Sequence, residues 1–210
     1  MDASFWHERW QANQIGFHEG DVNALLAAHF DRLDLAHGAR VFVPMCGKTR
    51  DIAWLLGKGM RVVGAELSEI AVQQLFDELG VEAEVIPMGA LTCYSAADIE
   101  IHVGDIFELT AEALRPVDAI YDRAALVALP GALRERYAAH LTAISNSAPQ
   151  LVITFDYDQD VMPGPPFCVP REEVDRLYGA AYQIADLAAV PVAGNLKGIA
   201  PAIETIRLLS

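Results

Sequence analysis

The stretch VFVPMCGKTRDIAWLLGKGMRVVGAELS, residues 41–68, decides the fold class. Its two apolar runs read as β-strands, and the segment between them has the period of a short helix. The first run is followed by Gly47, and the second ends in Glu66. This alternation of strand and helix predicts a parallel sheet with helices on both faces. Ligands of such sheets bind beyond the carboxyl ends of the strands, so Gly47 and Glu66 lie where a site is expected.

The separation of Gly47 and Glu66 indicates a nucleoside site. A glycine lets backbone and ligand approach closely, and an acid about 20 residues beyond such a turn can accept hydrogen bonds from both ribose hydroxyls. Glu66 follows Gly47 by 19 residues. The segment has no GxGxxG motif, which a pyrophosphate cradle would need. S-adenosylmethionine contains adenosine without a phosphate, so the pattern favours a methyl donor over a dinucleotide.

Further strands and helices are predicted along the rest of the chain. The predicted strands are residues 40–45, 61–66, 84–86, 100–103, 117–121, 151–155, 182–188 and 202–209, and the predicted helices are residues 5–14, 22–33, 51–56, 133–144 and 171–178. Ser68 is the expected N-cap of another helix, while residues 87–97 and 162–170 are expected to be loops. The last two strands have no helix between them, which favours antiparallel pairing.

Composition excludes several classes of function. The 210 residues carry a formal net charge of −14, which disfavours nucleic acid and anionic membranes as partners. The chain has neither a basic-then-apolar leader nor an apolar run of about 18 residues. Cys46, Cys93 and Cys168 lack the spacing of a zinc site or a disulfide framework. We therefore expect one cytoplasmic domain over residues 1–210, monomeric, with reduced cysteines and no metal.

Six segments, spread over nearly the whole chain, carry a resemblance to a known family. They are FWHERWQANQIGFHEGDVNALL (5–26), VFVPMCGKTRDIAWL (41–55), VVGAELSEIAV (62–72), VGDIFEL (103–109), IYDRAALVALP (120–130) and ITFDYDQDVMPGPPFCV (153–169). In order and spacing they resemble the thiopurine S-methyltransferase family, and in particular its bacterial members. The family usually has leucine where this chain has Met45, an unbranched residue of similar size.

The resemblance implies the fold of a class I S-adenosylmethionine-dependent methyltransferase. This α/β, Rossmann-like fold has a mostly parallel seven-stranded sheet with an antiparallel last strand and helices on both faces. Residues 1–35 would form an N-terminal helical lid segment. The implied activity is transfer of a methyl group from S-adenosyl-L-methionine to the sulfur of a small-molecule aromatic or heterocyclic thiol, such as a thiopurine.

The resemblance also implies a set of donor contacts. With the glycine turn and the adenine side included, the expected donor-binding residues are Trp10, Met45, Gly47, Glu66, Asp105, Ile106 and Arg123. The ring face of Trp10 can attract a sulfonium cation, although Trp6 and Trp10 are also spaced as the apolar face of a packed helix. Met45 would offer backbone groups to the donor, and Glu66 would hold the ribose.

The acceptor pocket is expected to involve Phe17, Pro166 and Phe167. The phenyl face of Phe17 would stack on a flat heterocycle, and the proline loop would form a rigid wall. Arg123 is the expected catalytic residue, because its charge favours an anionic sulfur. The alternative for Arg123 is a structural ion pair with Asp122 or Asp118. We name no general base, because aromatic heterocyclic thiols ionise easily.

Three other functions stay open at this point. The same fold could methylate selenium or tellurium oxyanions in detoxification, since related bacterial proteins are associated with resistance to them, such as tellurite resistance. A nicotinamide-dependent oxidoreductase is a second alternative, opposed by the missing GxGxxG motif and the antiparallel last strand. A non-catalytic S-adenosylmethionine sensor would bind the donor without turnover.

Overall fold

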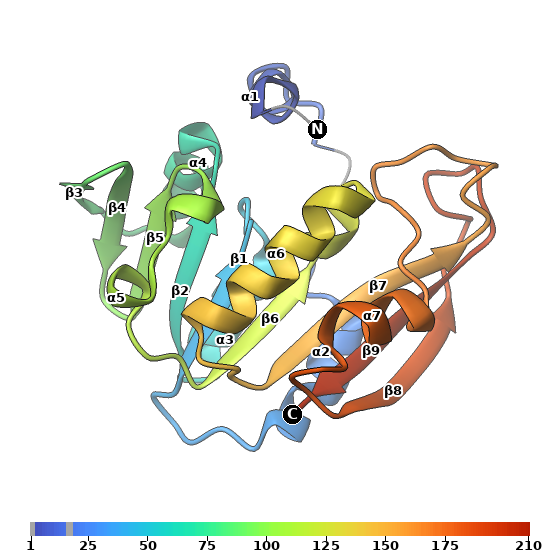
Figure 1. The fold of residues 1–210 in the computed structure, drawn as a ribbon. Helices are drawn as coiled ribbons and strands as arrows, with labels where there is room; N and C mark the ends of the chain where they lie inside the picture. Colours follow the sequence, from blue (N-terminus) through green and yellow to red (C-terminus); the bar gives the residue numbers. More distant parts are fainter. Residues whose placement is uncertain (1–2, 16–18) are drawn as a thin grey trace.

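A single nine-stranded sheet forms the centre of the computed structural model, which describes residues 3–15 and 19–210 (Figure 1). Its strand order is β3-β4-β5-β2-β1-β6-β7-β9-β8. The strands are β1 (Arg40–Pro44), β2 (Arg61–Glu66), β3 (Glu84–Met88), β4 (Leu91–Ala96), β5 (Ile99–Val103), β6 (Ala119–Arg123), β7 (Gln150–Tyr157), β8 (Ile184–Pro191) and β9 (Ala202–Leu209).

The predicted α/β class and the antiparallel last strand are confirmed. Strands β5, β2, β1, β6 and β7 pair in parallel, whereas β9 runs antiparallel to both β7 and β8. Because no helix separates β8 from β9, the chain reverses through a loop and pairs the two strands directly. The strand β9 therefore lies between β7 and β8 rather than at the edge of the sheet.

The sheet has nine strands rather than the seven that the resemblance implied, because an edge hairpin adds β4 to the short extra strand predicted at residues 84–86. Residues 87–97 were expected to be a loop, but β3 extends to Met88 and β4 pairs antiparallel with both β3 and β5. The turn contains Gly89, whose positive φ of 66° suits a residue without a side chain. The run LTCYSA of β4 has few large apolar residues, so its alternation is easily overlooked.

Helices cover both faces of the sheet, as predicted. One face carries α2 (Ala24–His29), η1 (Phe30–Leu33), α3 (Arg50–Gly57) and α4 (Glu69–Leu79), while the other carries η2 (Ile106–Glu108), α5 (Ala111–Leu114), η3 (Leu126–Ala128), α6 (Gly131–Ile144) and α7 (Arg171–Tyr178). Ser68 caps α4, since its side chain accepts a hydrogen bond from the Ala71 N–H. None of these helices, nor α1 (Ala3–Gln11), is long and apolar enough to cross a membrane.

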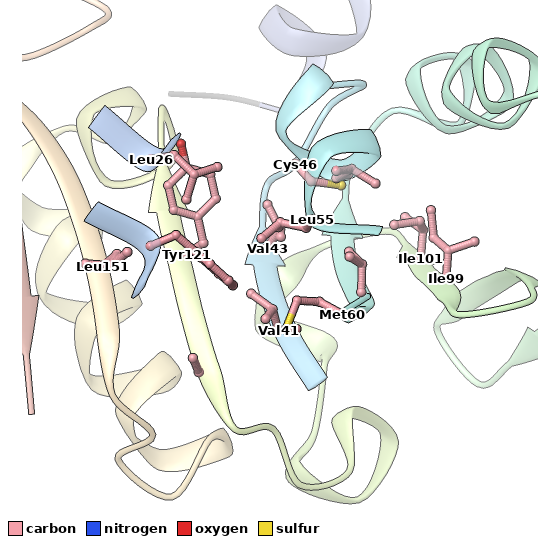
Figure 2. Packing of buried hydrophobic residues seen from close by; sticks show 14 of the residues in the cluster. Leu26, Val41, Val43, Cys46, Leu55, Met60, Ile99, Ile101, Tyr121 and Leu151 are labelled. Atoms are coloured by element: carbon pink, nitrogen blue, oxygen red, sulfur yellow. The ribbon is translucent and has the colours of Figure 1, made fainter. Parts of the chain in front are cut away.

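Strand alternation divides the apolar core between the two faces. Val41 and Val43 belong to one buried cluster and Phe42, between them, to the other. Figure 2 shows part of the first cluster, where Tyr121 and Leu55 approach the side chains of β1. Full burial of such a side chain stabilises the folded state by roughly 1.5–3 kcal/mol. Packing on both faces of the sheet therefore holds the strands, and the residues at their ends, in fixed positions.

The two N-terminal helices have different surroundings. The buried side chains of α2 and η1, from Leu25 to Leu33, belong to the core. By contrast, α1 lies beyond the carboxyl ends of β2 and β6 (Figure 1). Among the described residues of the predicted lid segment 1–35, α1 therefore lies where it can cover a site at the strand ends.

Candidate active site

A cavity of about 440 Å³ opens at the carboxyl ends of β1, β2, β6 and β7. This volume lies in the range usual for small-molecule sites. Its walls combine the strand ends with α1 and two distant loops. The lining residues are Trp6, Arg9, Trp10, Gln14, Glu19, Met45, Cys46, Gly47, Lys48, Thr49, Glu66, Leu67, Arg123, Ala124, Val127, Ala128, Ile153, Phe155, Pro165, Pro166, Leu196 and Lys197.

The turn after β1 brings the chain into direct contact with α1. Met45 and Gly47 have positive φ values of 47° and 51°. A Cβ atom added to Gly47 would lie only 3.1 Å from Cζ2 of Trp10, whose side chain is 4% exposed. The indole of Trp10 therefore covers the glycine turn, and Gly47 is needed both for its backbone conformation and for this close approach.

Glu66 ends β2 with its carboxylate at the same turn. One carboxylate oxygen accepts a hydrogen bond from the Gly47 N–H at 2.7 Å, and the other accepts from the Ser68 N–H at 2.8 Å. Burial raises the pKa of Glu66, and these backbone donors oppose the rise. Each carboxylate oxygen has two acceptor positions, so the carboxylate keeps acceptor capacity for a hydroxyl.

Arg123 ends β6 and points into the cavity with its charge already paired. Its guanidinium contacts the carboxylate of Glu19 and lies 3.8 Å from Oδ2 of Asp51. Asp51 is fully buried, and it accepts hydrogen bonds from the Asn23 N–H at 2.8 Å and from the Tyr121 hydroxyl at 3.0 Å. Because Asp51 is held by these donors, it fixes the direction of Arg123.

The ion pairs considered for Arg123 from the sequence, with Asp122 or Asp118, do not form. Asp122 points to the opposite face of β6 and accepts a hydrogen bond from the Tyr137 hydroxyl at 2.7 Å. Asp118 accepts from the Arg40 N–H at 2.7 Å. Burial raises the pKa of Asp122 to about 6. Alternation along the strand separates neighbouring side chains, so closeness in sequence is a poor guide to ion pairing here.

The proline loop after β7 forms the apolar end of the cavity. Pro165 and Pro166 line it, and the peptide bonds preceding both are cis. Phe167 is not a lining residue: a Cβ added to Gly164 would lie 2.6 Å from its ring. The Phe167 N–H donates to the Val127 carbonyl at 2.6 Å, which ties the loop to the segment after β6. The predicted acceptor residue Phe17 lies outside the described residues.

Two further predicted donor residues, Asp105 and Ile106, are not among the lining residues. Asp105 is exposed and accepts a hydrogen bond from the Phe107 N–H at 3.0 Å, where it caps η2. Ile106 is 8% exposed and belongs to the core. Both lie near the end of β2, because the Gly104 N–H donates to the Glu66 carbonyl at 2.9 Å.

Sequence reasoning missed some lining residues for a physical reason. Lys48 and Thr49 follow Gly47 directly, so their presence could have been inferred from the turn. Leu196 and Lys197 come from the loop between β8 and β9, and Arg9 comes from α1. No local pattern places these distant segments at the same cavity.

Neither of two cysteine environments supplies a reactive thiol. Burial raises the pKa of Cys46 well above its ordinary value. Cys93 opposes His102 across β4 and β5, and with Glu100 their ligand atoms lie within 4.8 Å of one another. Spacing along the chain does not reveal this cross-strand group. However, Glu100 already pairs with Arg40 and Arg115, and burial raises the pKa of Cys93 to about 11. The neutral thiol and the guanidinium groups oppose binding of a cation there.

Solved structures with a similar arrangement define the fold. The Burkholderia thailandensis 1,6-didemethyltoxoflavin-N1-methyltransferase, solved with bound 1,6-didemethyltoxoflavin and S-adenosylhomocysteine, aligns with a TM-score of 0.65 at 18% identity, over 98% of this chain and 86% of that chain. An S-adenosylmethionine-dependent methyltransferase from Anabaena variabilis aligns with a TM-score of 0.64 at 12% identity, over 99% and 95%. The fold is that of the S-adenosylmethionine-dependent methyltransferases.

Sequence comparison defines the family within that class. The family model for thiopurine S-methyltransferase (TPMT) matches residues 1–203. A thiopurine S-methyltransferase of Xanthobacter autotrophicus is 60% identical over 210 residues, which span 100% of this chain and 99% of that protein. The chain belongs to the thiopurine S-methyltransferase family, and the resemblance seen in the six segments is confirmed.

Proposed function

We propose that this protein transfers the methyl group of S-adenosylmethionine to the sulfur of an aromatic or heterocyclic thiol. One observation carries the proposal: a single cavity brings Trp10, Gly47, Glu66, Arg123 and Pro166 together in a chain of this family. These residues are far apart in the sequence and meet only through the sheet topology.

The end of the cavity at β1 and β2 suits the donor. Glu66 retains acceptor positions for ribose hydroxyls, and Met45 and Gly47 offer backbone beside the amino-acid part. The indole of Trp10 covers this end, where its face can attract the positive sulfonium. The methyl on that sulfonium is already activated, so the donor supplies the reactive carbon. Asp105 and Ile106 follow β5 next to the end of β2, on the side we assign to the adenine.

The end of the cavity at β7 suits a flat acceptor. Phe155, Pro165 and Pro166 make apolar walls, and Phe167 holds the proline loop from behind. In the reaction the sulfur electron pair forms the new bond to the methyl carbon, and the broken carbon–sulfur bond leaves its pair on the donor. The thiol proton goes to solvent before attack. Holding the reacting atoms in line can contribute roughly 7–11 kcal/mol.

We assign Arg123 the role of favouring the anionic form of the acceptor sulfur. Its guanidinium lies between the donor end and the acceptor end, and Asp51 holds it there. Glu19 competes for the same charge, so an anionic sulfur must displace or share this contact. A neutral isostere that cannot ionise would gain nothing from Arg123.

The experiment that tests this function compares acceptors of one shape. Thiophenol, phenol and aniline are each incubated with the protein and S-adenosylmethionine, and product is measured by mass spectrometry. We expect turnover of the thiol and none of the phenol or aniline. Equal turnover of aniline, or no turnover of any thiol with normal donor binding, would contradict the proposal.

The proposal extends to partners and location. The acceptor is a small molecule, and the protein acts as a cytoplasmic monomer. The three cysteines are free, and Cys46 and Cys93 are buried, which supports a reducing compartment. Sedimentation of the purified chain at micromolar concentration tests the monomer, and a stable dimer would contradict it.

A further inference from the structure

Two cations line the cavity without an acidic partner. Arg9 from α1 and Lys197 from the loop between β8 and β9 both line it. Within residues 3–15 and 19–210, neither is within ion-pair distance of a carboxylate. Arg9 contacts the face of Phe5 at 4.7 Å, and the Lys197 ammonium donates to the Pro165 carbonyl at 2.5 Å.

These unpaired cations contrast with the charge of the whole protein. The chain has 29 acidic and 15 basic residues, so most surface cations can find an acid nearby. Arg123, in the same cavity, already has Glu19 and Asp51. The two carboxylates that line the cavity are engaged elsewhere, Glu19 by Arg123 and Glu66 by backbone N–H groups. Arg9 and Lys197 therefore leave a positive potential that an anion would neutralise.

Lys197 lies beside the end of the cavity that we assign to the acceptor. Its contact with Pro165 anchors the ammonium beside the apolar wall formed by Pro165 and Pro166. Burial lowers the pKa of Lys197, and the charge of Arg9 lowers it further. A negative group bound between the two side chains would remove this repulsion.

We propose that Arg9 and Lys197 bind a second anionic group on the acceptor, apart from the reacting sulfur. The preferred acceptor is therefore an aromatic thiol that carries a carboxylate or a comparable oxyanion. The inference rests on the proposed methyl transfer, and it narrows the acceptor class for the same site. The apolar walls take the ring, Arg123 faces the sulfur, and the two cations take the distal anion.

The test compares a charged and a neutral acceptor on three proteins. 4-Mercaptobenzoate and 4-methylbenzenethiol have similar shape and differ in the distal charge. The ratio of their kcat/KM values is measured for the wild type, for Lys197→Met and for Lys58→Met. Lys58 contacts Trp54 outside the cavity, so its variant controls for the loss of one positive charge.

We expect Lys197→Met to lower the ratio about tenfold, as for loss of one charge-assisted hydrogen bond. Any effect of Lys197→Met that is common to both thiols cancels in the ratio, and Lys58→Met should leave the ratio unchanged. An unchanged ratio in Lys197→Met, with both thiols methylated, would overturn the anion subsite while leaving the proposed function intact.

Direct binding keeps the two claims apart. 4-Mercaptobenzoate is titrated into the wild type and into Lys197→Met, each saturated with S-adenosylhomocysteine. Binding that weakens about tenfold in the variant, without any turnover by the wild type, would support the subsite and contradict methyl transfer to thiols. Equal affinity for the two proteins would overturn the subsite whatever the turnover.

Discussion

Replacing Gly47 by alanine perturbs the donor end of the cavity in two separable ways. The backbone there has φ +51°, a conformation that costs about 1 kcal/mol for a residue with a Cβ. The new methyl would also lie 3.1 Å from Cζ2 of Trp10, so the indole must move by a few tenths of an ångström. We expect the displaced indole to weaken donor binding about tenfold, or roughly 1.4 kcal/mol.

Gly80→Ala is the matched control for the backbone effect. Gly80 has φ +68° at the end of α4, with no atom within 4 Å of an added Cβ. Both variants should lose about 1 kcal/mol of unfolding free energy in urea. Calorimetric titration with S-adenosylhomocysteine should show weaker binding for Gly47→Ala alone. If Gly47→Ala bound it as tightly as Gly80→Ala, the contact between Trp10 and the glycine turn would have no part in the donor site.

Three more predictions follow from the charges and from α1. Arg123→Ala should lower kcat for an aromatic thiol by about 100-fold, because the anionic sulfur loses its cation; steady-state rates check this, and an unchanged kcat would remove the proposed role. Burial raises the pKa of Asp122 from 3.8 to about 6, so the folded state binds the Asp122 proton more tightly than the unfolded state does. As the pH rises from about 4 to 6, the wild type should therefore lose stability relative to Asp122→Asn, by up to about 3 kcal/mol. Urea unfolding across that range measures the difference, and parallel pH profiles for the two proteins would contradict it. Finally, α1 should gain amide-exchange protection when S-adenosylhomocysteine binds, because Trp10 would close over the ligand; unchanged exchange over residues 5–15 would argue against a lid.

The framework of the fold was predictable because local signals and tertiary packing agree. The strand ending in Glu66 and the helix capped by Ser68 have the predicted positions. Gly47 and Glu66 were expected to lie at the same set of strand ends, and the two residues are joined by a hydrogen bond of 2.7 Å. The strand at residues 84–86 was predicted, but its hairpin partner β4 was missed, because LTCYSA has few of the large apolar residues that mark a buried strand.

The residue pattern alone could place only the site residues that follow strand ends, whereas Trp10 and Pro166 were expected from the family resemblance. Arg123 could be placed at the end of β6, but its partners Glu19 and Asp51 come from segments at least 72 residues away. Lys197 belongs to a loop whose path depends on the antiparallel pairing of β8 and β9. Contacts of this kind are set by topology, and a local sequence pattern contains no information on them.

The most direct test of the central claim is the position of a labelled methyl group. The protein is incubated with S-adenosylmethionine carrying a trideuterated methyl group and with 6-mercaptopurine, and the product is fragmented in a mass spectrometer. We predict one trideuteromethyl group on the sulfur, with an equal amount of S-adenosylhomocysteine formed. A label on a ring nitrogen, or no labelled product from a protein that binds S-adenosylhomocysteine, would contradict methyl transfer to sulfur.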